Sequence, residues 1–200
     1  DLAATRYAAA LSATPDDTAL ATRTYREAVI AGDRGLAIRT ARQLDMASAL
    51  PPDGLITLLI DDVAQKRWKA ARATVVRIEQ EQAFAFLAPI AHAWIDFGAG
   101  DIDPWVTLGK AGKGGNAGSG IFNAYLAENR ALMLLAQGSI SEGADAIAAI
   151  TPEPGIHELN LRVIAAEALA AAGKADQAQA LLAGDLPEFK AEAARISAAK

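Results

Sequence analysis

Along most of the chain, hydrophobic residues recur every three or four positions, the spacing of helices that are apolar on one face. Each such segment is about a dozen residues long and ends at glycine, at proline or at a group of polar residues. Glycine supplies the left-handed conformation that closes a helix, and proline cannot continue one. The pattern therefore predicts an all-α protein of short helices separated by tight turns.

The interruptions fall into two alternating classes. Those of the first class, here called the hairpin turns, recur at steps of 34, 34, 38 and 35 residues and are centred on Gly32, Lys66, Gly100, Gly138 and Gly173. Those of the second class are rich in proline, aspartate or glycine and occupy residues 14–17, 50–53, 109–120 and 151–154. Aspartates in these breaks can cap the helix that follows. This order predicts a succession of antiparallel helix hairpins.

The period and the helix–turn–helix order resemble the tetratricopeptide repeat (TPR) family. The family places a small residue five positions after each hairpin turn, where the second helix crosses the first, and another seven positions before it. Here these two sets read Ala37, Ala71, Trp105, Gly143 and Ala178, and Tyr25, Leu59, Ala93, Ala131 and Ala166. The resemblance implies a right-handed superhelical array of antiparallel helix hairpins, a TPR-like α-solenoid, with about five hairpins plus terminal helices. Other α-hairpin arrays and an unrelated helical bundle are the alternatives.

We expect residues 1–200 to form a single TPR-like repeat domain. Its start has the spacing of the second half of a repeat, and its end predicts one more amphipathic helix, either a cap or the first half of a further repeat. The expected repeats are residues 1–17 (partial), 18–51, 52–85, 86–120, 121–154 and 155–186, followed by a C-terminal helix over 187–200.

The third repeat departs from the pattern. Trp105 stands where a small residue belongs, and the second helix, with Asp103 as its cap and Pro104 as its first residue, is expected to run only to about Leu108. The glycine-rich stretch 109–120 follows at once. We expect looser packing here, with Trp105 filling the space that the short helix leaves.

The composition agrees with packed helices and limits the chemistry. Alanine supplies 49 and leucine 21 of the 200 residues, and both are strong helix formers. The chain has no cysteine, which excludes disulfide scaffolds, zinc–thiolate sites, iron–sulfur clusters and thiol catalysis. A net charge of −5 provides no basic field for nucleic acid or anionic lipid. The longest apolar runs are far shorter than a membrane span, so we expect no direct membrane insertion.

Two features imitate binding sites for small anions or metal ions. The glycine-rich stretch contains Lys110 and Lys113, but its spacing is not that of a phosphate-binding loop, and a flexible linker is the better interpretation. Asp101 and Asp103 could together bind a divalent cation, but they lie at a turn where capping aspartates are common. We therefore expect no cofactor and no metal.

The remaining candidates for catalytic groups are also incomplete. Asp61 and Asp62 lie near the end of a first helix and are expected to be a solvated or partner-facing pair rather than a catalytic acid and base. His92 and His157 are the only histidines, and packed or surface positions suit them better than the role of a general base. No catalytic residues are therefore assigned.

In the TPR family the first helices of successive repeats line a concave face on which segments of partner proteins bind. The residues thirteen, ten, six and three positions before each hairpin turn are expected to lie on this face. The middle of the face is apolar, which favours a hydrophobic strand or an amphipathic helix as the ligand. The residues expected to contact a protein partner are Arg26, Ile56, Ile60, Val63, Ile90, Trp94, Phe97, Tyr125 and Glu128. A TPR subgroup grips a terminal carboxylate with lysine and asparagine at such positions, and this chain lacks both there apart from Asn160.

The resulting hypothesis is a non-catalytic scaffold that binds a protein or peptide on its concave face. The alternative is a helical accessory domain of an enzyme or assembly factor, with the apolar face packed internally or in a homodimer. An enzyme would have to use Asp101, Asp103, His92 or Lys113. The alanine-rich repeats resemble those of exported TPR proteins of Gram-negative bacteria, which slightly favours a periplasmic over a cytoplasmic location.

Overall fold

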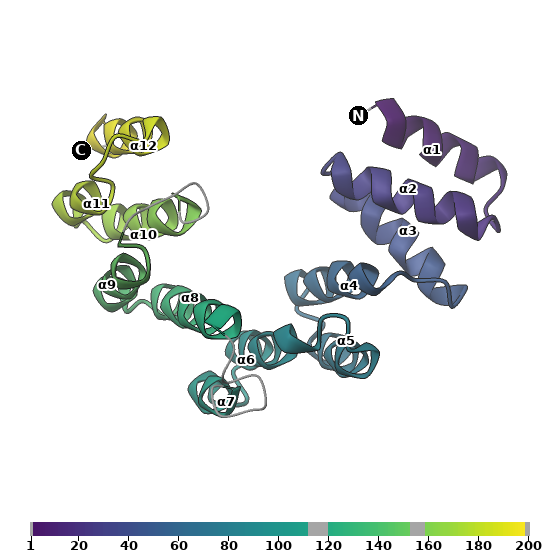
Figure 1. Ribbon diagram of the computed structural model, residues 1–200, viewed down its shortest axis with the longest axis horizontal. Coiled ribbons are helices and arrows are strands. Elements are labelled where there is room, and N and C mark those ends of the chain that lie inside the picture. The colour runs from purple at the N-terminus through teal and green to yellow at the C-terminus, as the bar shows by residue number, and fades with distance from the viewer. Residues whose placement is uncertain (1, 112–119, 153–158, 199–200) are drawn as a thin grey trace. The chain divides into compact units, whose positions relative to one another are not determined.

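The prediction of an all-α protein is confirmed by the computed structural model, which describes residues 2–111, 120–152 and 159–198 (Figure 1). Within these residues the chain forms twelve α-helices, one short 3-10 helix and no strand. The helices are α1 (Leu2–Ala13), α2 (Thr18–Ile30), α3 (Arg34–Met46), α4 (Pro52–Ala64), α5 (Trp68–Glu81), η1 (Ala85–Leu87), α6 (Ala88–Ala99), α7 (Pro104–Ala111), α8 (Gly120–Ala136), α9 (Ile140–Ile150), α10 (Leu159–Ala171), α11 (Ala175–Leu181) and α12 (Pro187–Ala198).

The five hairpin turns are closed by a left-handed residue at each predicted position. The φ angles are 70°, 55°, 71°, 94° and 75° at Gly32, Lys66, Gly100, Gly138 and Gly173. In four of these turns the next backbone N–H donates to the carbonyl five residues before it, as in a Schellman motif. These bonds are 2.8–2.9 Å long and join Asp33 to Ala28, Arg67 to Asp62, Ser139 to Leu134 and Lys174 to Leu169. The period read from the sequence is therefore a repeating feature of the backbone.

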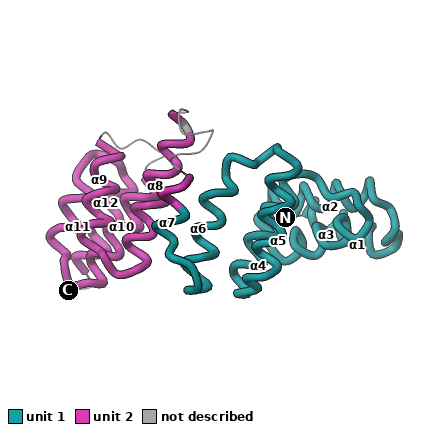
Figure 2. The backbone as a smooth tube through the Cα atoms, turned by 90° about the horizontal axis from the view of Figure 1, so that it is seen from below, with its two compact units in different colours: residues 1–107 teal, residues 108–200 magenta. Residues whose placement is uncertain are grey.

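The chain divides into two compact units, residues 1–107 and residues 108–200 (Figure 2). In unit 1 each helix packs on the next, from α1 to α6. One core, built largely from α2 and α3, includes Tyr25 and Leu44, and a second core under α4, α5 and α6 includes Leu55 and Val75.

Unit 2 has a single continuous core among its described residues. Helices α8, α9, α10 and α11 pack in succession, and α12 packs on both α10 and α11. Ala131, Ile147, Ala166 and Leu169 contribute to this core, and α12 adds the fully buried ring of Phe189. The C-terminal helix expected from the sequence is therefore part of the fold.

The small residues predicted at the helix crossings lie in the interior. Ala37, Ala71, Gly143 and Ala178 are buried, as the close approach of paired helices requires. Seven positions before the hairpin turns the residues are buried as well, and these are Tyr25, Leu59, Ala93, Ala131 and Ala166. Part of the alanine excess is therefore explained by packing.

The third hairpin has the short second helix that the sequence predicts. Asp103 Oδ1 accepts a hydrogen bond from Trp105 N at 2.9 Å, and the helix begins at Pro104. It ends at Ala111, three residues beyond the expected end, with Trp105 partly buried. The division between the two units falls within this helix, after Thr107. Lys113 and the rest of stretch 112–119 lie outside the described residues, as does His157.

Candidate functional site

Seven of the nine predicted contact residues lie in unit 1, and their accessibility differs. Arg26 on α2 is exposed, and Ile60 on α4 is 54% exposed. Ile56 and Val63, also on α4, are partly buried and pack against the core under α4, α5 and α6. Ile90 is only 6% exposed and offers almost no surface to a partner.

Two aromatic residues of α6 form the other accessible part of the predicted face in unit 1. Trp94 and Phe97 are partly buried, and their rings meet edge to face with centroids 5.6 Å apart and an interplanar angle of 75°. This geometry is a favoured arrangement for aromatic pairs. In unit 2, Tyr125 is exposed and Glu128 is partly buried, both on α8.

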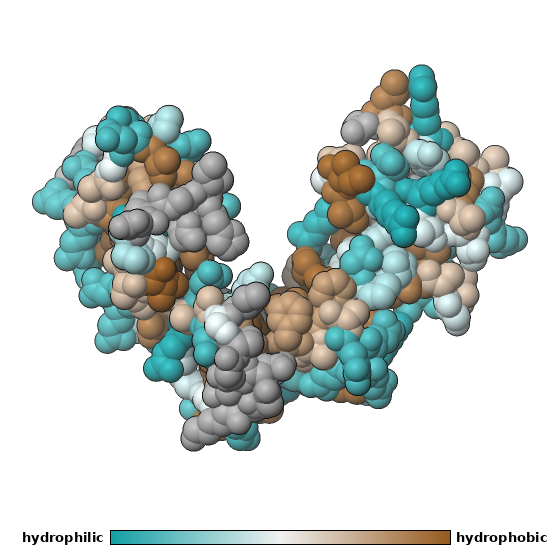
Figure 3. Space-filling model, viewed as in Figure 1, coloured by the Kyte–Doolittle hydropathy of each residue, from teal (hydrophilic) through white to brown (hydrophobic). Residues whose placement is uncertain are grey.

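A pocket of about 280 Å³ lies between the end of α2, the first hairpin turn, the start of α3 and the middle of α4. We call it the α2–α4 pocket; its lining residues are Ala28, Val29, Gly32, Arg34, Ala37, Ile38, Thr57 and Ile60. Space is left here because Ala28, Gly32 and Ala37 carry little or no side chain. Val29 and Ile60, which are 48% and 54% exposed, belong to the predicted concave-face positions. Figure 3 shows apolar surface over the C-terminal ends of α2 and α4.

The polar groups of the α2–α4 pocket are engaged within the protein, with one exception. The Thr57 hydroxyl lies 2.9 Å from Tyr25 Oη, which in turn donates to Asp53 Oδ2 at 3.2 Å. Burial raises the pKa of Tyr25, so the phenol keeps its proton at neutral pH. Gly32 N donates to Val29 O, and Gly32 O accepts from Arg34 N. The exception is the guanidinium of Arg34, which is exposed and has no carboxylate of the described residues within 4 Å.

Asp61 is held between two arginines, so the expectation that it is solvated or faces a partner is wrong. Its Oδ2 accepts from Arg42 Nη2 at 2.5 Å and from Arg67 Nη2 at 2.6 Å, and the residue is buried. Burial alone would raise the pKa of Asp61, but the hydrogen bonds from Arg67 and Arg42 outweigh it and lower the pKa. Arg42 is on α3, so the pair joins two successive hairpins.

Asp62 and Asp96 occupy matching positions, four residues before the second and third hairpin turns. Asp62 accepts from Arg67 Nε at 2.9 Å, and Asp96 accepts from Arg72 Nη1 at 2.7 Å and from Thr107 Oγ1 at 2.8 Å. Asp62 thus holds the turn of its own hairpin, and Asp96 joins α6 to α7 of the same hairpin and to α5 of the preceding one. Their contacts give them structural roles.

The remaining candidate groups of unit 1 also have partners within the protein. Asp101 pairs with Arg72 at 2.7 Å, and Asp103 caps α7. His92 Nε2 lies 3.6 Å from Glu79 Oε1. Among the described residues no group of three or more histidine, cysteine, aspartate or glutamate side chains is arranged to hold a metal ion.

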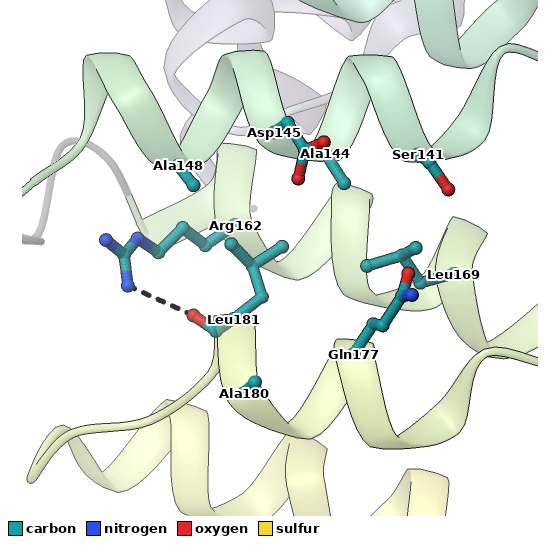
Figure 4. Close-up of a pocket in the computed structure, with 9 residues that line it drawn as sticks. All are labelled: Ser141, Ala144, Asp145, Ala148, Arg162, Leu169, Gln177, Ala180 and Leu181. Atoms are coloured by element: carbon teal, nitrogen blue, oxygen red, sulfur yellow. Dashed lines mark hydrogen bonds between the residues drawn. The ribbon is translucent and has the colours of Figure 1, made fainter.

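Unit 2 contains a pocket of about 410 Å³ between α9, α10 and α11 (Figure 4). Its wall includes Arg162, a buried arginine whose donors are turned away from the cavity. Arg162 Nε donates to Thr151 Oγ1 at 3.0 Å, Nη1 donates to Leu181 O at 3.0 Å, and Nη2 donates to Thr151 O. Burial lowers the pKa of Arg162. In Figure 4 the guanidinium points to the Leu181 carbonyl and away from Asp145, the acidic residue of the wall.

The position of Arg162 explains why a cation is buried here without a carboxylate of the described residues beside it. Thr151 follows the last residue of α9, and Leu181 is the last residue of α11. The C-terminal carbonyls of a helix lack intrahelical donors and carry partial negative charge. Arg162 satisfies carbonyls at the ends of both helices at once, which is a structural role that the sequence analysis missed.

No helix of the described residues combines the length and the apolar character needed to cross a bilayer. Comparison with protein-family models, with curated proteins and with solved structures finds no match to this chain.

Proposed function

We propose that this chain is a TPR-like repeat protein that acts as a non-catalytic scaffold and binds a segment of a partner protein on the surface of its first helices. The observation that carries the proposal is the α2–α4 pocket. It lies where the repeat pattern projects the ligand-contacting positions, and two of those positions, Val29 and Ile60, form part of its exposed wall. An exposed apolar hollow bordered by polar groups is typical of a protein-binding surface.

The proposed architecture is a right-handed superhelical stack of hairpins. Support comes from the five left-handed hairpin turns at near-constant spacing and from the buried small residues at the helix crossings. In unit 1, bonds between successive hairpins recur, as between Arg42 and Asp61 and between Arg72 and Asp96. Contacts between each hairpin and its neighbours are the defining property of such arrays.

The proposed absence of catalysis is supported by the contacts of the acidic residues. Asp61, Asp62 and Asp96 are bound by arginines, and Asp103 caps a helix. A catalytic acid or base would instead need a free functional atom directed at a substrate.

A capture experiment tests the proposed function. The wild-type chain and the double variant Ile60→Asp, Trp94→Ala are immobilised, exposed to an extract of the source organism, and the captured proteins are quantified by mass spectrometry. Met46→Asp is the matched control, because Met46 is 83% exposed on α3 and does not line the pocket. Truncating a central aromatic anchor typically costs about 2 kcal/mol of binding free energy, about a 30-fold loss of affinity.

We expect one or a few proteins to be enriched by the wild type and by Met46→Asp and to be lost from the double variant. Circular dichroism melting must first show that the double variant is folded. A folded double variant that captures the same proteins as the wild type would contradict the proposed binding surface, and a wild-type chain that enriches no protein would contradict the scaffold itself.

A further inference from the structure

The size of the α2–α4 pocket limits what it can hold. Its volume of about 280 Å³ lies just below the range of about 300–1,000 Å³ in which pockets enclose drug-sized ligands. The wall is apolar where Val29, Ile38 and Ile60 line it, and the side chains of Val29 and Ile60 are exposed to solvent. A single bulky apolar side chain presented by another molecule suits this shape better than a complete cofactor.

The chemistry of the wall limits the neighbours of that side chain. Thr57 and the backbone of Gly32 already have hydrogen-bond partners. Arg34 is therefore the one polar lining residue whose side chain has no partner among the described residues and can bind a ligand. Guanidinium groups bind carboxylates with two parallel hydrogen bonds. A ligand that fills the pocket therefore gains most if a carboxylate stands close to its apolar side chain.

Two exposed arginines, one on the pocket wall and one near it, reinforce this preference. Arg26 is exposed on α2, three residues before Val29 and hence on the same side of the helix. Within the described part of the chain, neither Arg26 nor Arg34 has a carboxylate within 4 Å. Asp33, the acidic neighbour of Arg34 in sequence, instead accepts from Leu36 N at 2.9 Å and caps α3.

We propose that the α2–α4 pocket receives one leucine-sized side chain from an internal acidic segment of the partner protein, with glutamate or aspartate beside it paired with Arg34. This assignment rests on the proposed scaffold function and adds the chemistry of the partner. The apolar side chain supplies the buried area, and the carboxylates supply orientation and selectivity against basic segments.

The test uses short fluorescein-labelled peptides of glycine and serine, amidated at the C-terminus, with a central leucine flanked by glutamates. Matched peptides replace the glutamates by glutamines or by lysines, or the leucine by alanine. Binding to the full 200-residue chain is measured by fluorescence anisotropy at low salt.

We expect the glutamate peptide to bind about threefold more tightly than the glutamine peptide, which is the scale of one exposed ion pair. The lysine and alanine peptides should bind more weakly than the glutamate peptide. The difference between the glutamate and glutamine peptides should shrink at about 0.5 M salt because of screening.

Two variants connect the binding to the pocket. Arg34→Glu should reverse the order of the glutamate and lysine peptides, and Ile60→Asp should weaken the binding of the glutamate and glutamine peptides, because it places a charge on the apolar wall and offers neither peptide an opposite charge. Arg39→Glu and Met46→Asp are the matched controls, because both residues are exposed on α3 and neither lines the pocket. The controls should retain the wild-type order and affinities.

The possible failures separate this inference from the scaffold proposal. Equal binding of the glutamate and lysine peptides, no binding of the glutamate peptide, or equal effects of Arg34→Glu and Arg39→Glu would overturn the assigned ligand. If the wild-type chain captures a partner that Arg34→Glu captures equally well, the pocket assignment is wrong and the scaffold proposal stands. If no partner protein is captured at all, the scaffold proposal fails even if the peptides bind.

Discussion

Gly143 lies where α9 crosses α8, and its replacement by alanine tests the close approach of these helices. An ideal Cβ at this position would lie 2.6 Å from Leu135 Cδ2 and 2.9 Å from Leu135 N. The leucine side chain can rotate away, but its backbone nitrogen can move only if the helix shifts. Such overpacking costs about 1–3 kcal/mol, whereas alanine in place of glycine within a helix gains about 1 kcal/mol. We expect Gly143→Ala to lower the free energy of unfolding by about 1 kcal/mol.

Two other glycines provide matched substitutions of the same chemistry. A Cβ on Gly109, in α7, would meet no atom within 4 Å, so Gly109→Ala should raise the free energy of unfolding by up to about 1 kcal/mol. A Cβ on Gly54, in α4, would meet only the flexible side chain of Leu50. Gly54→Ala should therefore fall between the other two variants.

The assay is urea unfolding followed by circular dichroism, with thermal melting as a second measure. For a chain of 150–250 residues, 1 kcal/mol corresponds to about 2–4 °C in Tm. If Gly143→Ala is as stable as Gly109→Ala or more stable than the wild type, the two helices do not approach as closely as argued.

Three further predictions concern the turns and the buried charges. Lys66 adopts a left-handed φ of 55°, which is strained for a residue other than glycine. Lys66→Gly should therefore raise the free energy of unfolding, measured in urea, by about 0.5–1 kcal/mol. Arg162→Met leaves the Thr151 and Leu181 carbonyls without their buried donor and should lower the same quantity by about 2–4 kcal/mol. The lowered pKa of Asp61 means that its contribution is complete above the ordinary aspartate pKa of 3.8 and is lost as the pH falls through the folded-state pKa. Asp61→Asn should therefore destabilise the chain at pH 7, and its deficit relative to the wild type should shrink below about pH 3.8, as followed by urea unfolding across pH.

Each of these predictions has a control and a contradicting result. Gly138→Ala should destabilise, because it makes the reverse change at an equivalent turn, and a loss of stability in Lys66→Gly would contradict the strain argument. Arg162→Lys keeps the charge but not the geometry, so full stability in that variant would show that charge alone suffices. A pH-independent deficit in Asp61→Asn would contradict the ionic origin of its effect.

The hairpins could be predicted because their turns depend on local backbone geometry. A left-handed residue every 34 to 38 positions leaves a mark in the sequence, usually glycine, and the period identified Lys66 where glycine is missing. The start of α7 was predicted for the same reason, since Asp103 and Pro104 act within one turn of helix. Features of this kind can be predicted because they depend only on residues that are close together in the sequence.

The errors arose where distant residues decide the environment. A charged pair at a helix end is usually solvated, which is the expectation for Asp61, but Arg42 reaches it from the preceding hairpin, 19 residues away. The repeat position of Ile90 predicts a place on the binding face, yet the residue is buried. Arg162 lies eleven positions before its hairpin turn, and the residues that match it in the first two hairpins are the buried Ala21 and Leu55. An arginine at a position that is apolar in other repeats was therefore an available signal for a buried cation.

The placement of charge in unit 1 reverses what the net charge of the chain suggests about its partner. A net charge of −5 would favour a basic ligand. In unit 1, however, Asp61, Asp62 and Asp96 are bound by arginines between and within hairpins, so these carboxylates are already neutralised. Arg26 and Arg34 stand outside these pairs, on α2 and α3, two of the three helices that border the α2–α4 pocket. Because screening limits such charges to a range of about 10 Å, the guanidinium of Arg34 on the pocket wall matters more to a bound ligand than the net charge of the whole chain, and an acidic segment is the ligand that can pair with it.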